Sequence, residues 1–310
     1  MASRMRPQAG HLVDHRGFSL IELLVALSIG LFLLMGAIYV FQQTRTQYRA
    51  IESVARVQEA ARYAMSVLEN DLRLAGYWGR HNQSSSVTGQ PDVLDLELCG
   101  SGDTFSPTTG NLATYIAGGP ALDFGDACAL NRRAETDALL IRRASVDPVP
   151  PETFADPDLV PSLQTGILYA QSNYVGTLIF EGNSIPVPYF SEFSDTHRLV
   201  THGYYISDTS ESDPNLPALR RLSLGTGPAV IDEEIIHGIE DLTVEFGLDT
   251  NGDGRVNEWT NDEAAVAADP SIAVRLTLAV RSETRENDVE PDGFRRIQLT
   301  KTIYLRNQRR

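Results

Sequence analysis

One carboxylate lies inside the apolar segment near the start of the chain. Glu22 is the fifth residue of a run from Phe18 to Phe41 that otherwise carries no charged side chain. A charged group at the centre of a membrane helix costs about 2.5–3.5 kcal/mol on insertion scales, so Glu22 requires a cationic partner. An amino terminus created by cleavage directly before Phe18 would supply that charge. The chemistry suggested here is the pairing of an acid with an amine in an apolar environment.

The residues around this acid have a fixed order. The segment GFSLIELLVALSIG, from Gly17 to Gly30, follows a short basic leader of 17 residues. It resembles the class III signal of type IV pilins and pseudopilins. The resemblance implies that a prepilin peptidase cleaves between Gly17 and Phe18 on the cytoplasmic side and then N-methylates Phe18. It also implies that Glu22 neutralises the amino terminus of a neighbouring subunit as the apolar helices bundle into a filament.

Two simpler interpretations explain less of this segment. An ordinary secretory signal has an apolar core of about 7–15 residues followed by a small-residue cleavage site. The run here is longer, and no Ala-x-Ala site closes it. A simple signal anchor explains the length but neither Glu22 nor the Gly17–Phe18 pair. Because three arginines precede the run, we expect a cytoplasmic amino terminus and an exported remainder.

A second group of oxygen-bearing residues lies near the end of the chain. The segment DTNGDGRVNEWT resembles an EF-hand loop, with Gly254 at the sixth position, where the chain turns sharply. Its candidate Ca²⁺ ligands are the side chains of Asp249, Asn251, Asp253 and Asn257 and the backbone carbonyl of Arg255. The twelfth position, where a bidentate Glu belongs, is Thr260. The alternative is a polar turn between strands, for which Asp, Asn and Gly are the usual residues.

The two cysteines predict one disulfide. Cys99 and Cys128 form no CxxC pattern, and an even cysteine count in an exported protein favours a disulfide. The bond would close a loop of about 30 residues and stabilise the fold by roughly 3 kcal/mol in the chain-entropy model. The enclosed segment is rich in Gly, Ser, Thr and Pro. We therefore expect the disulfide to fix a segment that a hydrophobic core cannot hold in place. The alternative is a pair of buried thiols.

Catalytic chemistry finds little support in the sequence. His197 and His202, near Asp195, form the nearest approach to a cluster, and no GxSxG, P-loop or HExxH motif is present. We therefore predict that the protein is not an enzyme. A membrane-tethered periplasmic enzyme that uses His197 or Asp195 is the alternative from another functional class.

The charge balance argues against nucleic-acid binding. The chain of 310 residues has a formal net charge of −15, and loss of the leader, with three Arg and one Asp, leaves −17. Phosphate backbones require a basic face, which so acidic an exported chain does not suggest.

A long helix must position the acid near the amino terminus. The segment from Gln42 to Ala75 contains no Pro or Gly, and Gly76 then fits a helix end. Its apolar residues recur at steps of three, four and seven, which predicts one apolar stripe. That stripe comprises Ile51, Val54, Ala61, Met65, Leu68, Leu72 and Ala75. We predict one helix of about 85 Å from Phe18 to Ala75. It has a transmembrane half (18–41) and an amphipathic continuation (42–76) that packs on a head; a coiled-coil partner is the alternative.

The remainder, residues 77–310, reads as strands separated by polar and Pro-rich loops. The last two runs alternate cleanly and predict half-buried antiparallel strands. The predicted strands are Ala138–Arg142, Thr177–Glu181, Leu199–Ile206, Leu219–Leu224, Gly238–Leu248, Ile272–Arg281 and Arg295–Leu305. The fold class is therefore α+β, a long amino-terminal helix packed on an antiparallel β-sheet head, as in pilins.

Several segments of this head resemble PilW-type minor pilins. They are ENDLRLAGYWG (Glu69 to Gly79), RRLSL (Arg220 to Leu224), HGIEDLTVEFGLDTNGDG (His237 to Gly254) and the final strand pair. The middle of the chain, roughly Gly100 to Ser194, carries no motif that aligns.

The resemblance implies a low-abundance subunit that helps to initiate type IV pilus assembly near the fibre tip. The implied partners are other minor pilins, the major pilin, a tip-associated adhesin, the prepilin peptidase and the inner membrane. The precursor would span the inner membrane once, with a periplasmic head, and later reach the cell surface in the pilus. A pseudopilin of a type II secretion system uses the same amino-terminal chemistry and is the close alternative.

Overall fold

The computed structural model describes residues 17, 19–81, 84–100, 103–107, 112, 114–125, 127–149, 163–184, 194–227, 229–262, 271–286 and 291–307. Phe18 and most of the leader lie outside these residues. The chain divides into two compact units, Met1–Glu52 and Ser53–Arg310. Each unit is described below by itself.

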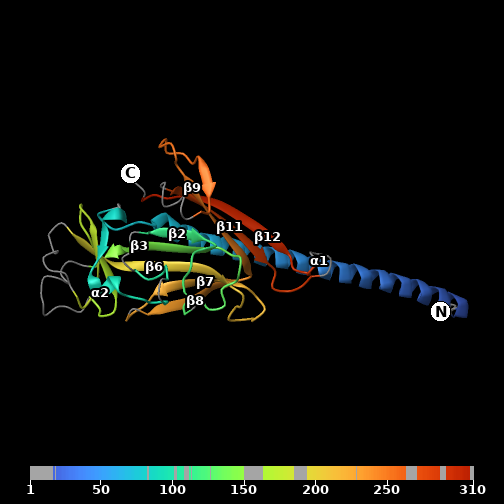
Figure 1. Cartoon of the computed structure of the whole chain (residues 1–310). Coiled ribbons are helices and arrows are strands. Elements are labelled where there is room, and N and C mark those ends of the chain that lie inside the picture. Colours follow the sequence, from blue (N-terminus) through green and yellow to red (C-terminus); the bar gives the residue numbers. More distant parts are fainter. Residues whose placement is uncertain are drawn as a thin grey trace, which may run out of the picture. The chain divides into compact units, whose positions relative to one another are not determined.

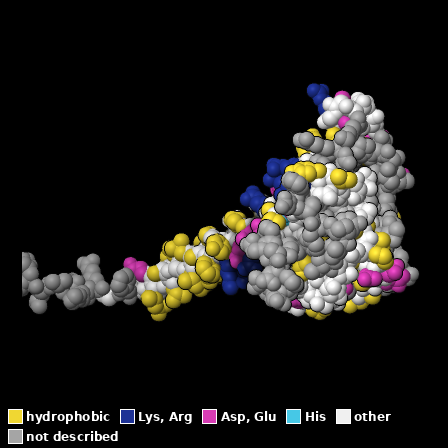
Figure 2. Space-filling view, turned by 90° about the vertical axis from the view of Figure 1, so that its left-hand side faces the viewer, with side chains coloured by type: hydrophobic (Ala, Val, Ile, Leu, Met, Phe, Trp, Pro, Cys, Tyr) yellow, Lys and Arg dark blue, Asp and Glu magenta, His cyan; other side chains and the backbone are white. Residues whose placement is uncertain are grey.

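One helix dominates the first part of the chain. Helix α1 runs from Leu20 to Leu74 over 55 residues, which confirms the prediction of a single long helix. Within the first unit its apolar side chains are exposed, and Figure 2 shows them covering the helix. By length and composition this segment is apolar enough to cross a membrane. The helix ends where Gly76 adopts a φ of +69° and its N–H donates to the carbonyl of Arg142.

The second unit contains an eight-stranded sheet, in the order β1-β5-β4-β6-β3-β2, with β7 added to β6 and β8 added to β7. All pairs are antiparallel except β1 with β5. Figure 1 shows β3, β6, β7 and β8 side by side. The strands are β1 (Val87–Gly89), β2 (Ile116–Gly119), β3 (Ala138–Pro148), β4 (Leu168–Ser172), β5 (Thr177–Glu181), β6 (Asp195–Ser207), β7 (Ala218–Leu224) and β8 (Val230–His237). A 3₁₀ turn, η1 (Ser84–Ser86), and a short helix, α2 (Pro91–Leu94), flank β1.

A second sheet is built from the end of the chain. It has the order β10-β9-β11-β12 and is antiparallel throughout. Its strands are β9 (Ile239–Leu248), β10 (Glu258–Thr260), β11 (Ser271–Arg281) and β12 (Arg296–Tyr304). The predicted pairing of the last two runs is confirmed, because β11 and β12 pair from Ala273 opposite Tyr304 to Arg281 opposite Arg296.

The main core lies between the second half of α1 and both sheets. The helix contributes Val57, Ala61, Ala64, Met65, Leu68 and Leu72. They pack with Leu139 and Tyr204 of the larger sheet and with Leu242 and Leu276 of the smaller one. The apolar stripe therefore packs within the chain, as predicted. Ile51 was predicted to belong to it and is 70% exposed, because the buried stripe begins only at Val57.

Strand β8 was not predicted, because its sequence VIDEEIIH contains three consecutive acids and no alternation. The structure explains their presence in a strand, since β7 places arginines beside them. Arg220 Nε donates to Asp232 at 2.9 Å, and Arg221 Nε donates to Glu233 at 2.8 Å. These acids therefore form ion pairs with arginines of the neighbouring strand.

Candidate functional site

The acid in the apolar run belongs to the first turn of α1. Ser19 precedes the helix, and its hydroxyl accepts a hydrogen bond from the Ile21 N–H at 3.3 Å. The Oε2 atom of Glu22 accepts one from the Ser19 N–H at 2.9 Å. These reciprocal bonds form a capping box, which satisfies two backbone donors at the start of a helix. The S-x-x-E pattern could have identified Ser19 from the sequence, and our sequence reasoning missed it.

The predicted processing site lies directly before this turn. Gly17 is exposed, and no atom lies within 4 Å of the position that a Cβ would occupy. Phe18 is outside the described residues, so cleavage and N-methylation at this site stay predictions. Glu22 is exposed, and among the described residues it bonds only within its own turn, so its pairing with the amine of another subunit also stays a prediction.

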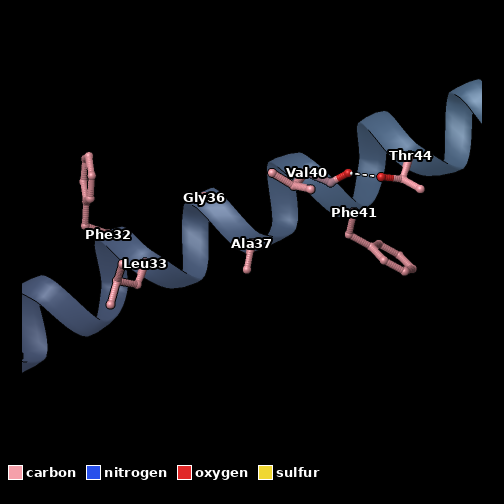
Figure 3. A pocket seen from close by; sticks show the side chains of 7 residues that line it. All are labelled: Phe32, Leu33, Gly36, Ala37, Val40, Phe41 and Thr44. Carbon is pink, nitrogen blue, oxygen red and sulfur yellow. Dashed lines mark hydrogen bonds between the residues drawn. The ribbon is translucent and has the colours of Figure 1, made fainter.

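A shallow notch marks the apolar half of α1. Figure 3 shows Gly36 and Ala37 at its floor, with larger side chains on either side. The lining residues are Phe32, Leu33, Gly36, Ala37, Val40, Phe41 and Thr44. The Thr44 hydroxyl donates to the Val40 carbonyl at 2.8 Å, so its polar group is satisfied inside the helix. Small residues at such a notch allow a second helix to approach closely in lipid.

The second half of α1 carries a buried acid that fixes the helix to the larger sheet. Asp71 is 7% exposed and accepts hydrogen bonds from Arg143 Nη2 at 3.0 Å and from the Tyr204 hydroxyl at 2.5 Å. His202 Nδ1 contacts the same carboxylate. Burial alone would raise the pKa of Asp71, but the bonds from His202 and Tyr204 and the charge of Arg143 outweigh it and hold the pKa well below its usual range. Asp71 is therefore buried although it does not belong to the predicted apolar stripe.

The predicted disulfide is present. Cys99 and Cys128 are bonded, with Cα atoms 5.2 Å apart. Arg142 of β3, fully buried, binds the segment enclosed by the disulfide. Its guanidinium donates to the carbonyls of Thr104, Phe105, Ser106 and Thr114, and burial lowers its pKa. The expectation that no core holds this segment is wrong, because Phe105, Leu122 and Phe124 are buried against the larger sheet. The arginine adds hydrogen bonds to that apolar core.

The candidate calcium loop is closed by its own amides. Asp249 is buried, and its carboxylate accepts hydrogen bonds from the N–H groups of Gly252, Asp253 and Gly254 at 2.7, 3.1 and 3.0 Å. Asn251 Nδ2 lies 3.4 Å from Asp253 Oδ2, so three of the predicted ligand residues are brought together.

The rest of the ligand set is weaker. Asn257 Oδ1 accepts from the Thr250 N–H, and Thr260 is held in β10 opposite Phe246. No cluster of three or more His, Cys, Asp or Glu side chains that could hold a metal occurs among the described residues. The loop thus offers two carboxylates, two side-chain amides and one backbone carbonyl.

The residues considered for catalysis are each held in a separate contact. His197 Nδ1 lies 2.8 Å from the Ser145 carbonyl, and burial lowers the pKa of His197. Asp195 is paired with Arg80, whose Nε donates at 2.6 Å. His202 contacts Asp71. The structure does not assemble these three side chains around a shared site.

Comparison with known proteins gives two family matches. Residues 203–307 match the family described as "Type IV Pilus-assembly protein W", and residues 14–38 match the "Prokaryotic N-terminal methylation motif". A pilin-like protein of Thermus thermophilus, PilA3, is 34% identical over 93 residues. The match spans 29% of this chain and 40% of the relative. No solved structure matches the chain.

Proposed function

We propose that this chain is a type IV pilin-like protein of the PilW type and acts as a minor pilin that primes or supports pilus assembly near the fibre tip. The observation that carries the proposal is the placement of Glu22 in the first turn of an exposed apolar helix, within the segment that matches the methylation motif. No catalytic step is part of this function. Its chemistry is the cleavage of the precursor by a peptidase and the pairing of charges between subunits.

The assembly step uses three features of α1. Removal of residues 1–17 exposes the amine of Phe18, which the prepilin peptidase then methylates. The carboxylate of Glu22 exchanges its bond to the Ser19 N–H for the amine of a neighbouring subunit. The notch at Gly36 and Ala37 lets that neighbour's helix pack closely. Burial in the bundle strengthens the charge pair, because the local dielectric constant is low.

The size of the head supports a position near the tip. A shaft subunit must repeat with neighbours on every side, and a second unit that runs from Ser53 to Arg310 is bulky for such a repeat. Glu22 is retained, so the subunit still has a neighbour whose amine it neutralises. The partners are other minor pilins and the major pilin, with a tip-associated adhesin beyond them.

Two measurements test the processing and pairing steps. Amino-terminal sequencing of the mature protein is expected to begin at N-methylated Phe18. The variant Glu22→Ala is expected to be processed normally but to enter sheared pili poorly, whereas the control Glu59→Gln, an exposed acid further along α1, enters normally. A mature protein that begins elsewhere, or normal incorporation of Glu22→Ala, would contradict the assembly role.

Deletion of the chain separates the proposal from a type II secretion pseudopilin. We expect loss of surface pili and twitching motility with normal exoprotein secretion. The match of residues 203–307 to a pilus-assembly family favours this outcome. Lost secretion with normal pili would assign the chain to the secretion system instead.

We also propose that the loop from Asp249 to Asn257 binds Ca²⁺ weakly. The supporting observation is a loop already closed, in which Asp249 and Asp253 lie close together and Asp253 forms no ion pair with any described residue. The ligand set of the loop comprises two carboxylates, two amides and a carbonyl. It resembles that of extracellular Ca²⁺ sites, whose Kd is near 10⁻⁴–10⁻³ M. Bound Ca²⁺ would tie the loop to β9 and β10.

Thermal unfolding of the full chain in detergent tests this proposal. At about tenfold Ca²⁺ over a Kd of about 1 mM, binding adds about 1.4 kcal/mol, which corresponds to about 3–6 °C in Tm. Asp253→Asn is expected to abolish the shift. Asp213→Asn, in another loop where Asp213 accepts from the Asn215 N–H, is the matched control that keeps it. An unchanged melt in EDTA and in Ca²⁺ would remove calcium from the account.

A further inference from the structure

Aromatic and basic side chains follow the apolar run of α1. Tyr39, Phe41 and Tyr48 are 70%, 67% and 71% exposed. Arg45 and Arg49 are also exposed and form no ion pair or hydrogen bond with a side chain among the described residues. On the face shown in Figure 2, Lys and Arg side chains appear on the helix where its apolar covering ends. We call Phe41, Arg45, Tyr48 and Arg49 the collar.

The collar lies at a defined distance along the helix. The run from Phe18 to Phe41 spans about 36 Å at 1.5 Å per residue, slightly more than the roughly 30 Å of a bilayer's hydrocarbon core. Arg45 lies about 6 Å beyond Phe41, inside a head-group layer about 5–8 Å thick. Arg49 lies about 12 Å beyond Phe41, and its long side chain can reach back to the same layer. This placement rests on the membrane insertion proposed above.

The charges of the collar are unfavourable unless an anionic surface faces them. Arg45 and Arg49 are four residues apart, so two like charges are neighbours on one helix face and repel each other. Both also lie on the exported side of the apolar run, where they oppose the orientation set by the arginines of the leader. The mutual repulsion of the two arginines disfavours them at positions 45 and 49, and so does their opposition to the membrane orientation of the chain. Negatively charged phosphate groups would offset both effects, and a zwitterionic surface would do so only weakly.

Aromatic residues complete this surface. Phe41, Arg45 and Tyr48 follow at steps of four and three and therefore share one face of the helix. Tyrosine rings prefer the boundary between lipid tails and water, where the ring contacts lipid and the hydroxyl contacts water. Tyr39 and Tyr48 flank the calculated boundary.

We propose that the collar binds the head groups of anionic phospholipids at the exported face of the inner membrane. This contact holds the helix at a fixed depth until the subunit enters the filament. An acidic surface on a neighbouring pilin is the competing occupant, and the test distinguishes the two.

The test uses the full chain in nanodiscs that contain equal amounts of phosphatidylcholine and phosphatidylglycerol. Native mass spectrometry counts the lipids that stay bound. The wild-type chain is expected to retain phosphatidylglycerol preferentially, and each of Arg45→Gln and Arg49→Gln lowers that preference about fivefold. Arg62→Gln is the matched control, because Arg62 is an exposed arginine of the same helix beyond the collar.

A second readout measures depth. Both native cysteines are in the disulfide, so a spin label attached through Thr44→Cys is the single labelled site. In phosphatidylglycerol nanodiscs the double variant Arg45→Gln/Arg49→Gln is expected to shift the label relative to the wild type, whereas Arg62→Gln leaves its depth unchanged.

Three results would overturn the proposal. They are an equal phosphatidylglycerol preference in the wild type and the double variant, an unshifted label, and cross-links from position 45 to an acidic pilin in membranes without anionic lipid. Alkaline extraction of membranes distinguishes failure of the lipid-binding proposal from failure of the minor-pilin proposal. A chain that is released from membranes contradicts the minor-pilin proposal itself. A chain that stays inserted and processed but shows no lipid preference contradicts only the collar.

Discussion

Replacing Asp71 by Ala is expected to loosen the attachment of α1 to the larger sheet. The side chain of Asp71 is 10% exposed, and those of Arg143 and His202 are 13% and 15% exposed. The Tyr204 hydroxyl is fully buried. Removal of the carboxylate therefore leaves a guanidinium, an imidazole and a phenol without the acceptor that all three share.

The size of the effect follows from this burial. Removing one partner of a buried ion pair costs about 3–5 kcal/mol, mostly because the other charge stays buried without compensation. A 1 kcal/mol change moves Tm by about 2–4 °C in a unit of this size, so Tm is expected to fall by about 6–20 °C. Replacement of both charges, as in Asp71→Leu with Arg143→Met, removes the uncompensated guanidinium and should cost less than Asp71→Ala alone.

Tryptophan fluorescence during thermal unfolding of the full chain in detergent measures this effect. Trp78 and Trp259 both lie in the second unit, so the signal reports on the head. Glu59→Gln, an exposed acid on the same helix, serves as the control and should change Tm by less than about 2 °C. A loss below about 1 kcal/mol for Asp71→Ala would refute the claim that this acid fixes the helix.

The same carboxylate predicts a dependence on pH. Its pKa is lower in the folded chain than in the unfolded chain, so its contribution is present above the unfolded value, about 3.9, and is lost as the pH falls toward the folded value. The wild-type head should lose stability progressively below about pH 4. Asp71→Asn should flatten this decline, and parallel profiles for the two proteins would contradict the assignment.

Three further predictions concern other contacts. Cys99→Ser with Cys128→Ser should lower the free energy of unfolding by about 3 kcal/mol in urea titrations, and a reductant should have the same effect on the wild type. Arg142→Met removes the donor to four carbonyls, two of them in buried hydrogen bonds, so we expect about 3–5 kcal/mol of destabilisation and faster chymotrypsin cleavage after Phe105; unchanged cleavage would contradict this. Ser19→Ala removes one half of the capping box at a cost of about 1 kcal/mol and should reduce incorporation into pili, whereas Ser19→Thr should restore it.

Local patterns predicted α1 well. The absence of Pro and Gly from residues 42–75, the spacing of apolar residues and the glycine at position 76 together predicted the helix end to within a residue of its position at Leu74. The disulfide could also be predicted from the sequence, because the prediction depends only on the even number of cysteines and on the oxidising compartment. The S-x-x-E pattern of Ser19 and Glu22 was equally local, and only its overlap with the processing motif obscured it.

Contacts between distant residues could not be predicted in this way. Asp71 is polar and lies beside Leu72, so nothing in α1 alone reveals that Arg143, His202 and Tyr204 surround it. The acids of β8 look like a loop until β7 supplies their arginines. In each case the stabilising partner is at least 12 residues away, and a single sequence does not show which distant residues meet.

Two acids on one helix illustrate opposite uses of a carboxylate group. Glu22 is exposed and accepts a single hydrogen bond from the backbone of its own turn, which an arriving amine can replace at a cost of about 1 kcal/mol. Asp71 is buried and bound by three side chains, so losing its partners would cost several times more. The proposed role in filament assembly needs an acid that can change partners at the membrane and a helix that does not separate from its head. The burial of the two carboxylates separates these tasks along α1, which is why substitutions at Glu22 should alter incorporation without altering Tm, and substitutions at Asp71 should alter Tm.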